Sequence, residues 1–375
     1  MMKTEHLMNN YGTRSRTMVR GQGVYLYDDA GEEYLDFCAG IAVCSLGHAH
    51  PGVTTVLSDQ ATQLIHCSNL FLIPQQADLA TKLCSISHFS RALFCNSGAE
   101  ANEAALKLAR RYASARDGNR TKLISLPGSF HGRTMGSLSL TPKKAYQAGY
   151  TPLLPHCVTP PSMEATLAEV DETTAAVFIE MIQGEGGVIP LSAAFVNALA
   201  ARAKAVGALL VVDEVQTGVG RTGRFFAYEE YGIQPDIVTL AKGLANGVPI
   251  GAILATEEVA AAFTPGSHGT TFGGNPLSTA VANYVVREVS DEKFLSHVRR
   301  MGRVLERGLR GLAMGVTGRG LMWGMDMPDA KAYVEAAAKN GVLLTTAGET
   351  RVRWLPPLIV QEHQIEEALR RVRHI

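Results

Sequence analysis

The sequence predicts an α/β protein whose largest part is a mostly parallel sheet. Short apolar runs rich in Val, Ile and Leu recur along the chain and have the length of buried strands, namely 91–95, 121–126, 175–179, 208–212 and 236–240. Segments typical of helices separate several of these runs, among them the alanine-rich stretch 193–206. Repeated strand–helix units with right-handed crossovers produce a sheet whose strands run mostly in one direction.

Length and composition indicate a globular protein with a large core. The chain has 375 residues, of which 46% are hydrophobic and 19% charged, and its 35 basic and 35 acidic side chains cancel. The formal net charge is therefore zero, and it does not favour nucleic acid or a membrane surface as a partner. No apolar run approaches the ~20 residues that span a bilayer, and MMKTEHLMNN lacks the apolar core of a signal peptide. The six cysteines have no metal-site spacing, so we expect reduced thiols in a cytoplasmic protein.

The two ends of the chain are expected to form one small α+β domain. Alternating apolar and polar residues on either side of Asp28-Asp29-Ala30-Gly31 predict a β-hairpin. From about Ser290 the predicted elements are arginine-rich helices over 294–312, a strand in TGRGLMWGMDM, a helix over 330–340, a hairpin through VRWLPPLIV and a last helix from Gln361. We assign 1–50 and 290–375 to this domain and 51–289 to the large one.

Two chemically active side chains follow neighbouring predicted strands. Asp213 comes directly after the run 208–212, and Lys242 comes shortly after 236–240. Ligands of open α/β sheets bind beyond the carboxyl ends of the strands, so both side chains should face one crevice. Together they form either an ion pair or a cofactor site, and the glycines that follow Lys242 favour a site that a ligand approaches closely. A lysine amine reacts with the aldehyde of pyridoxal phosphate, and the pyridine nitrogen of that cofactor requires an acidic partner such as Asp213.

A phosphate site is predicted where the strand 91–95 leads into a helix. In CNSGAEANEAALKLARRYA, Asn96 or Ser97 suits the N-cap, Gly98 allows a tight turn, and strong helix formers follow from Ala99. The free N–H groups and the positive end of the helix dipole attract an anion. For this segment taken alone, the alternative is an ordinary helix N-cap that binds no phosphate.

Three loops carry further candidate binding residues. Phe130 in SFHGRTMG could stack on a planar cofactor, and Arg133 could either grip a carboxylate or form a loop-stabilising ion pair. The QGEGG segment places Glu185 at the same sheet edge, beyond the strand 175–179. Thr270 and Thr271 offer hydroxyl groups to a phosphate.

Two other patterns are weaker signals. GVGRTG (218–223) matches the dinucleotide fingerprint, but five residues separate it from the strand and no long helix follows, so a dinucleotide site is not expected. His48 and His50 have no third ligand nearby, and we expect them to bond the surrounding turn rather than a metal.

Taken together, the motifs resemble those of the class III, fold-type I, pyridoxal-phosphate-dependent aminotransferases. The likeness covers nearly the whole chain and is carried by NSGAEANE, FHGRT, QGEGG, DEVQTGVGRTG, LAKG with PIGA, GTTFGGNP and RWLPPL. LGHAHP, CSNLF and the compact length are similar to the subgroup that uses N2-acetylornithine as amino donor. Cys44-Ser45 departs from this pattern, since the family often has Asn there. Succinylornithine, N-succinyldiaminopimelate, ornithine and 4-aminobutyrate therefore remain open as donors, as does a decarboxylase or racemase on the same scaffold.

The resemblance implies a seven-stranded large domain, a homodimer with the active site at the subunit interface, and a set of cofactor contacts. Lys242 would bind pyridoxal phosphate covalently, and Asp213 would meet its pyridine nitrogen. The remaining cofactor contacts would be Ser97, Gly98 and Ala99 at the phosphate with Thr271 of the second subunit, Gln216 at the phenolic oxygen, and Val215 and Phe130 on the two ring faces.

For the substrates, the resemblance implies amine transfer from acetylornithine to 2-oxoglutarate. Arg133 and Thr270 would contact acetylornithine. Arg353 would receive the α-carboxylate of glutamate, and Glu185 would neutralise Arg353 while acetylornithine is bound, because an unpaired buried cation is costly.

Overall fold

A seven-stranded sheet forms the centre of the molecule. The computed structural model describes residues 5–12, 14–116, 118 and 120–375. The strand order is β4-β12-β11-β10-β7-β5-β6, with bounds Arg91–Cys95, Gly251–Ala255, Ile237–Leu240, Leu209–Asp213, Thr174–Ile179, Lys122–Ser125 and Cys157–Val158. β12 is antiparallel to both of its neighbours, and the other adjacent pairs are parallel. The predicted α/β class and the mostly parallel sheet are confirmed.

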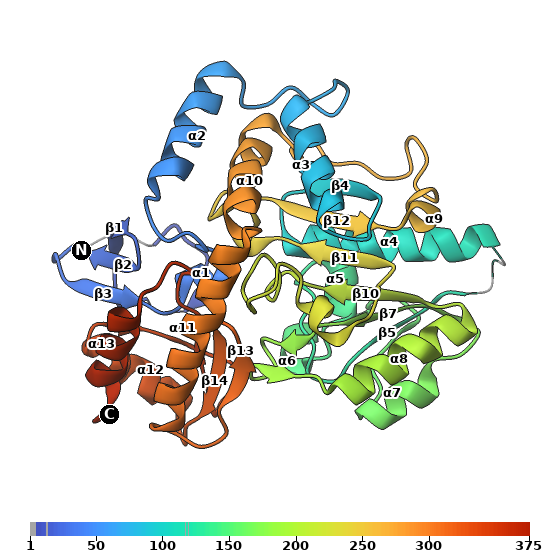
Figure 1. Ribbon diagram of the computed structural model, residues 1–375. Helices are drawn as coiled ribbons and strands as arrows, with labels where there is room; N and C mark the ends of the chain where they lie inside the picture. Colours follow the sequence, from blue (N-terminus) through green and yellow to red (C-terminus); the bar gives the residue numbers. More distant parts are fainter. Residues whose placement is uncertain (1–4, 13, 117, 119) are drawn as a thin grey trace.

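The inner strands of this sheet are buried on both faces, which explains why most of their residues are apolar. In β10, Leu209 and Val211 belong to the core on the side of helix α4 (Gly98–Arg116), whereas Leu210 and Val212 belong to the core on the side of α8 (Ala193–Val206). Alternate residues of a strand point to opposite faces, so a strand covered on both faces has few polar positions. Figure 1 shows α4 behind the sheet and α8 in front of its lower strands.

Further helices complete the large part of the molecule. Helices α2, α3 and α10 pack together beside the sheet (Figure 1). The elements of this part outside the sheet are α2 Pro51–Gln63, α3 Pro74–Ser85, α5 Met135–Ser139, α6 Lys144–Gln147, α7 Met163–Glu169, β8 Ile182–Gln183, β9 Ile189–Pro190, η2 Ala227–Tyr231, η3 Lys242–Ala245, α9 Glu257–Ala260 and α10 Pro276–Val289. Two short elements, η1 Asn9–Tyr11 and α1 Ala39–Ala42, belong to the N-terminal segment. Within the part of the chain that the structure describes, no helix is long and apolar enough to cross a membrane.

Segments from the two ends of the chain share a smaller sheet. The predicted hairpin is formed by β2 (Tyr25–Asp28) and β3 (Glu33–Asp36), and β1 (Met18–Gln22) extends it. On its other edge, β3 pairs in parallel with β15 (Val342–Leu343). Because this ladder joins segments about 300 residues apart, we propose that 1–50 and 290–375 form one domain and 51–289 the other.

The C-terminal part differs from the prediction in two places. TGRGLMWGMDM forms two antiparallel strands, β13 (Thr317–Arg319) and β14 (Met322–Asp326), instead of one, because Gly320 turns the chain with a φ of +56°. The predicted hairpin through VRWLPPLIV is also wrong. Its first residues form β17 (Arg351–Trp354), which pairs with β14 and with β16 (Thr345–Thr346), and the two prolines that follow cannot donate ladder hydrogen bonds.

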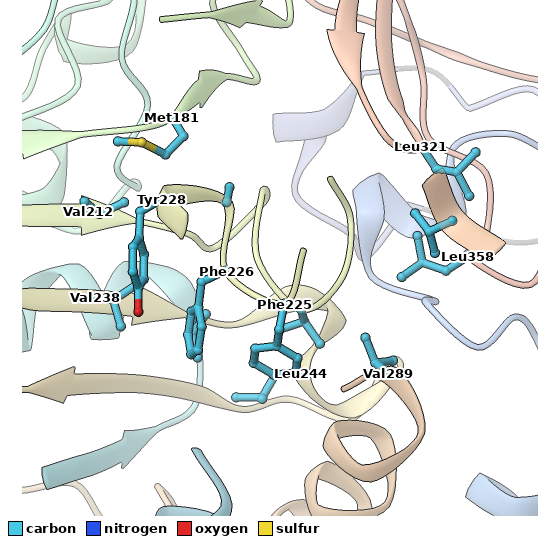
Figure 2. Close-up of a cluster of buried hydrophobic side chains, with 14 of the residues drawn as sticks. Met181, Val212, Phe225, Phe226, Tyr228, Val238, Leu244, Val289, Leu321 and Leu358 are labelled. Atoms are coloured by element: carbon cyan, nitrogen blue, oxygen red, sulfur yellow. The ribbon is translucent and has the colours of Figure 1, made fainter. Parts of the chain in front are cut away.

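Three helices complete the C-terminal part: α11 (Glu292–Arg310) packs on β14, α12 (Ala330–Lys339) packs on β16 and β17, and α13 (Glu362–Val372) packs on α11 and β15. One apolar core connects this region to the central sheet. Figure 2 shows Val212 and Val238 of the sheet, Phe225 and Phe226 of the loop after β10, and Leu321 and Leu358 of the C-terminal part as members of one cluster. The loop that carries the GVGRTG motif is therefore part of the packed core.

Candidate active site

A cavity of about 360 Å³ lies at the carboxyl ends of the central strands. It contains most of the predicted cofactor residues, and its lining includes Ser97, Gly98, Ala99, Asn102, Phe130, His131, Arg133, Glu180, Asp213, Val215, Gln216 and Lys242. A larger hollow of about 770 Å³ lies over α4 and 152–155, and none of the predicted site residues lines it.

Lys242 reaches the cavity from the first position of η3, directly beyond β11 and Ala241. Its backbone has a φ of +41°, a conformation that costs a non-glycine residue of order 1–3 kcal/mol and that occurs mostly at functional sites. Burial and the nearby Arg353 guanidinium lower the pKa of the Lys242 amine to about 8, although Glu185, Asp213 and Glu180 oppose this shift. An amine with this pKa is partly neutral near pH 7 and can act as a nucleophile or a base.

Asp213 is the last residue of β10 and is 4% exposed. Its Oδ2 lies 2.8 Å from Nδ1 of His131 and accepts a hydrogen bond from Nδ2 of Asn102 at 2.8 Å, while Oδ1 accepts from the Val215 amide at 2.9 Å. Burial alone would raise the pKa of the carboxyl group, but the His131, Val215 and Asn102 hydrogen bonds outweigh it and hold this pKa low. Asp213 is thus a buried carboxylate that can face a cation.

Sequence reasoning missed the two side chains that hold Asp213. Asn102 lies on the face of α4 that otherwise buries alanine and leucine, and its amide also donates to the His131 carbonyl oxygen at 2.7 Å. A single polar residue on an apolar helix face was the signal that could have identified it. His131 is fully buried, and its Nε2 has no partner among the described residues.

The first turn of α4 presents free backbone donors. Ser97 caps the helix by accepting from the Glu100 amide at 3.2 Å, and the amides of Gly98 and Ala99 donate to none of the described residues. A Cβ at position 98 would lie 2.6 Å from Cγ1 of Val215, so only glycine allows the helix and Val215 to approach this closely. These donors, together with the reactive lysine and the buried carboxylate, fit the phosphate, aldehyde and pyridine nitrogen of pyridoxal phosphate.

Arg133 stands at the exposed rim of the cavity. Its guanidinium lies 3.4 Å from the ring centroid of Tyr146 and 5.7 Å from that of Phe130. Within the described residues it forms no ion pair, so the alternative of a loop-stabilising ion pair does not apply there. Arg133 is therefore a stacked cation available to a carboxylate.

Glu185 and Arg353 meet just outside the cavity lining. Nη1 of Arg353 donates to Oε1 of Glu185 at 2.6 Å and to Oε1 of Gln216 at 3.1 Å. Arg353 is 1% exposed, and its Nε has no partner among the described residues. Gln216 lines the cavity, so it connects this ion pair to the site.

Thr270 and Thr271 do not line the cavity of their own chain. Thr270 accepts hydrogen bonds from Asn96 Nδ2 and from the Gly273 amide, each at 3.2 Å, whereas Thr271 is exposed. A contact between Thr271 and a cofactor therefore requires a second chain.

His48 and His50 contact different parts of the structure. Among the described residues there is no cluster of His, Cys, Asp or Glu that could hold a metal ion. The ring of His48 also has a partner beyond the surrounding turn, because Nε2 lies 2.7 Å from Oδ2 of Asp36 on β3. His50 packs against Tyr284, with 5.8 Å between the ring centroids.

Comparison with known proteins gives one consistent family. The family model described as aminotransferase class-III matches residues 8–375. The acetylornithine aminotransferase of Aquifex aeolicus (strain VF5) is 48% identical over 99% of both chains, and that of Gloeobacter violaceus is 46% identical over 97% of this chain and 94% of the other. Among solved structures, the ornithine aminotransferase of Toxoplasma gondii ME49 superposes with a TM-score of 0.94 at 31% identity, covering 98% and 91% of the two chains. The N-acetylornithine aminotransferase of Stenotrophomonas maltophilia K279a gives 0.84 at 36% identity, covering 97% and 96%.

Proposed function

Because the chain belongs to the pyridoxal-phosphate-dependent class III aminotransferases, we propose that it transfers the terminal amine of N2-acetyl-L-ornithine to 2-oxoglutarate. The products are N-acetyl-L-glutamate 5-semialdehyde and L-glutamate, in a step of arginine biosynthesis. Support comes from the acetylornithine aminotransferases that are 40–48% identical over nearly the whole chain. The alternatives are other ω-amino donors, among which ornithine is favoured by the ornithine aminotransferases with similar structures.

When bound, pyridoxal phosphate supplies an aldehyde for the substrate amine and a cationic ring that accepts electrons from the reacting carbon. Lys242 would hold it covalently, Asp213 would keep the ring nitrogen protonated, and the Ser97–Ala99 turn would bind the phosphate. Phe130 and Val215 would cover the two ring faces, and Gln216 would meet the phenolic oxygen.

Lys242 is also proposed as the proton carrier. Its Nζ would remove the proton from the substrate carbon that bears the amine and later return a proton, acting first as general base and then as general acid. The pKa of about 8 suits both roles, since neither protonation state is strongly disfavoured near neutral pH. The Lys242 side chain lines the cavity in which the substrate carbon would lie.

The observation that carries the substrate assignment is the unequal state of two arginines. Arg133 has no acidic partner among the described residues, whereas Arg353 is neutralised by Glu185 at 2.6 Å. A site in this state offers one free arginine, which suits a donor with a single carboxylate, such as acetylornithine, and the choice of acetylornithine among such donors rests on the similar proteins. Glutamate has two carboxylates, so its α-carboxylate would displace Glu185 from Arg353 while Arg133 holds the distal carboxylate.

We further propose that the enzyme is a homodimer that completes its active site across the interface. Leu70, Phe71 and Leu72 are 86%, 67% and 99% exposed, and Phe272 beside Thr271 is 62% exposed. Contiguous exposed apolar side chains of this size mark interaction surfaces. Thr271 would then reach the phosphate held by the other subunit.

An amino-donor screen tests the assignment. The cofactor-loaded enzyme is mixed with acetylornithine, succinylornithine, ornithine or 4-aminobutyrate, and the loss of the cofactor's visible absorbance is followed in single turnovers. We expect acetylornithine to react with the highest second-order rate constant and 2-oxoglutarate to restore the absorbance. Faster reaction with ornithine would show that the donor assignment is wrong, and carbon dioxide release or epimerisation without amine transfer would overturn the aminotransferase itself.

A further inference from the structure

Glu180 is a buried carboxylate in the cavity to which neither the sequence motifs nor the proposed function gives a role. It follows β7 directly, is 5% exposed and lines the cavity together with Lys242 and Asp213. A buried carboxylate is retained at such a position at considerable desolvation cost, so its contacts should explain what it does.

Each oxygen of Glu180 accepts a hydrogen bond from a different substrate-facing loop. Oε2 accepts from the amide of Phe130 at 3.0 Å, and Oε1 accepts from the amide of Gly184 at 3.3 Å. The first loop carries Phe130 and Arg133, and the second carries Glu185, which neutralises Arg353. One carboxylate therefore links the two parts of the site that select the substrate.

The two loops touch each other, so a change in this link affects both. Gln183 donates from Nε2 to the Pro127 carbonyl oxygen at 2.8 Å. A Cβ at position 186 would lie 2.8 Å from the carbonyl oxygen of Gly128. The loops are packed too closely for either of them to shift alone.

We propose that Glu180 is a positioning residue that fixes the Phe130 loop and the Glu185 loop relative to each other, and that it does so only while ionised. A carboxylate accepts from both amides, whereas a carboxylic acid directs its O–H at one of them and cannot satisfy both. The consequence for substrate choice rests on the proposed function, and the loop geometry itself does not.

The charges around Glu180 place this change near neutral pH. The groups that face it are His131 on the Phe130 loop, Asp213 beyond β10 and Lys242 in η3. Burial raises the pKa of Glu180 to about 7, assisted by the Asp213 charge and opposed by His131 and by the two amides. As the pH falls through about 7, the carboxylate takes up a proton and releases one loop.

Glu180→Gln is the test variant, because its amide group keeps the size of the carboxyl group but has one acceptor oxygen in place of two. Glu214→Gln is the matched control. Glu214 follows the neighbouring strand, is 1% exposed and accepts the amides of Ala227 and Tyr228 at 2.8 Å each, but it does not line the cavity. Burial raises the pKa of Glu214 to about 8, so it also titrates in the tested interval. A general effect of removing a buried, amide-bonded carboxyl group should therefore appear in both variants.

Amide hydrogen exchange of the cofactor-loaded enzyme measures the link without any substrate. After correction for intrinsic exchange, we expect the Phe130 and Gly184 amides of the wild type to be more protected at pH 8 than at pH 6. In Glu180→Gln, the protection factor of the Phe130 amide, the Gly184 amide or both should be about fivefold lower at pH 8, which corresponds to one lost hydrogen bond. The difference in protection between pH 8 and pH 6 should disappear in this variant. Glu214→Gln should leave both amides unchanged. Full protection of both amides in Glu180→Gln would overturn the proposal.

A ratio of half-reactions tests the effect on substrate choice. Both substrates react with the same lysine, so the ratio of the acetylornithine to the glutamate rate constant cancels the titration of Lys242. We expect this ratio to fall from pH 8 to pH 6 in the wild type, and to be about fivefold lower and independent of pH in Glu180→Gln. A pH dependence that persists in Glu180→Gln would refute the role of Glu180. If acetylornithine fails to react at all, the proposed function is wrong, and amide exchange still decides whether Glu180 positions the loops.

Glu180→Asp is the second test variant, and it keeps the proposal testable if Glu180→Gln does not fold. Aspartate keeps two acceptor oxygens on a shorter stem, so it should retain a pH-dependent ratio, even if the overall rates fall. Loss of the pH dependence in a folded Glu180→Asp enzyme would count against the ionised carboxylate as the cause.

Discussion

Nη1 of Arg353 lies 2.6 Å from Oε1 of Glu185, and this contact connects β17 in the C-terminal part to the loop beyond β7. The guanidinium is buried, whereas the Glu185 side chain is 26% exposed. The carboxylate is therefore the partner that can move away, and the arginine stays in place to meet whichever anion replaces it.

Glu185→Gln should slow the acetylornithine half-reaction more than the glutamate half-reaction. Without the carboxylate, the buried guanidinium is uncompensated when the substrate supplies no second carboxylate, and removal of one member of a buried pair is costly. We expect at least about a tenfold loss with acetylornithine, equivalent to ~1.4 kcal/mol, and a much smaller loss with glutamate.

Single-turnover absorbance measurements separate the two half-reactions. Asp326→Asn is the control. Asp326 pairs at 2.7 Å with Arg351, which lies on the same strand as Arg353, but Asp326 does not line the cavity. Equal losses in both half-reactions of Glu185→Gln would rule out a switch at Arg353.

Gly98→Ala should weaken cofactor binding. A Cβ at this position would lie 2.6 Å from Cγ1 and 2.9 Å from Cγ2 of Val215, so the first turn of α4 or Val215 must shift. Overpacking of this kind costs about 1–3 kcal/mol, from which we expect about a tenfold or greater increase in the Kd for pyridoxal phosphate.

Fluorescence titration of the cofactor-free protein measures this change. Gly311→Ala is a suitable control, since a Cβ there meets its nearest neighbour at 3.3 Å in the cap of α11, far from the cavity. An unchanged Kd in Gly98→Ala would mean that this turn does not hold the phosphate.

The elements that sequence reasoning predicted well are those whose own residues decide their structure. The helix predicted over 193–206 is observed as Ala193–Val206, because Ser192 caps it and Gly207 ends it in a left-handed conformation. Asp213 and Lys242 were placed at one cavity because both follow strands of the same sheet. The two-strand form of TGRGLMWGMDM was missed, since its turn depends on the close packing of Gly320 against Thr222, 98 positions away.

The environment of the site could be predicted less well than its principal residues. Asn102 and His131 bind Asp213 from 111 and 82 positions away in the sequence, a relationship that local patterns do not contain. The role of Glu180 likewise depends on two loop amides that become neighbours only in the fold. The position of Thr271 relative to a cofactor requires a second subunit, so it stays a prediction.

Lys242 should react as an unusually acidic lysine. In the cofactor-free protein, the rate of its modification by an amine-reactive reagent should be half-maximal near pH 8, because burial and Arg353 lower its pKa to about 8. Ordinary lysines titrate near pH 10.4. Peptide mass spectrometry over pH 6–10 measures the profile, and borohydride reduction of the cofactor-loaded enzyme should add the cofactor mass to the same peptide. A midpoint near that of ordinary lysines, or a reduced adduct on a different lysine, would contradict the assignment.

His48→Asn should destabilise the protein at neutral pH but much less at alkaline pH. Burial lowers the pKa of His48, but the 2.7 Å contact with Asp36 and the nearby Cys44 outweigh it and raise the pKa to about 9. A group whose pKa is raised on folding contributes all of its stabilisation below its unfolded pKa of about 6.5 and loses it as the pH rises through 9. The difference in unfolding free energy between the wild type and His48→Asn should therefore be of order 3 kcal/mol at pH 6 and fall steadily towards pH 10.

Urea unfolding at several pH values measures this difference. His363→Asn is the control, because His363 is exposed. A difference that stays constant from pH 6 to pH 10 would show that the His48 charge does not stabilise the fold, because packing alone has no reason to vary over that interval.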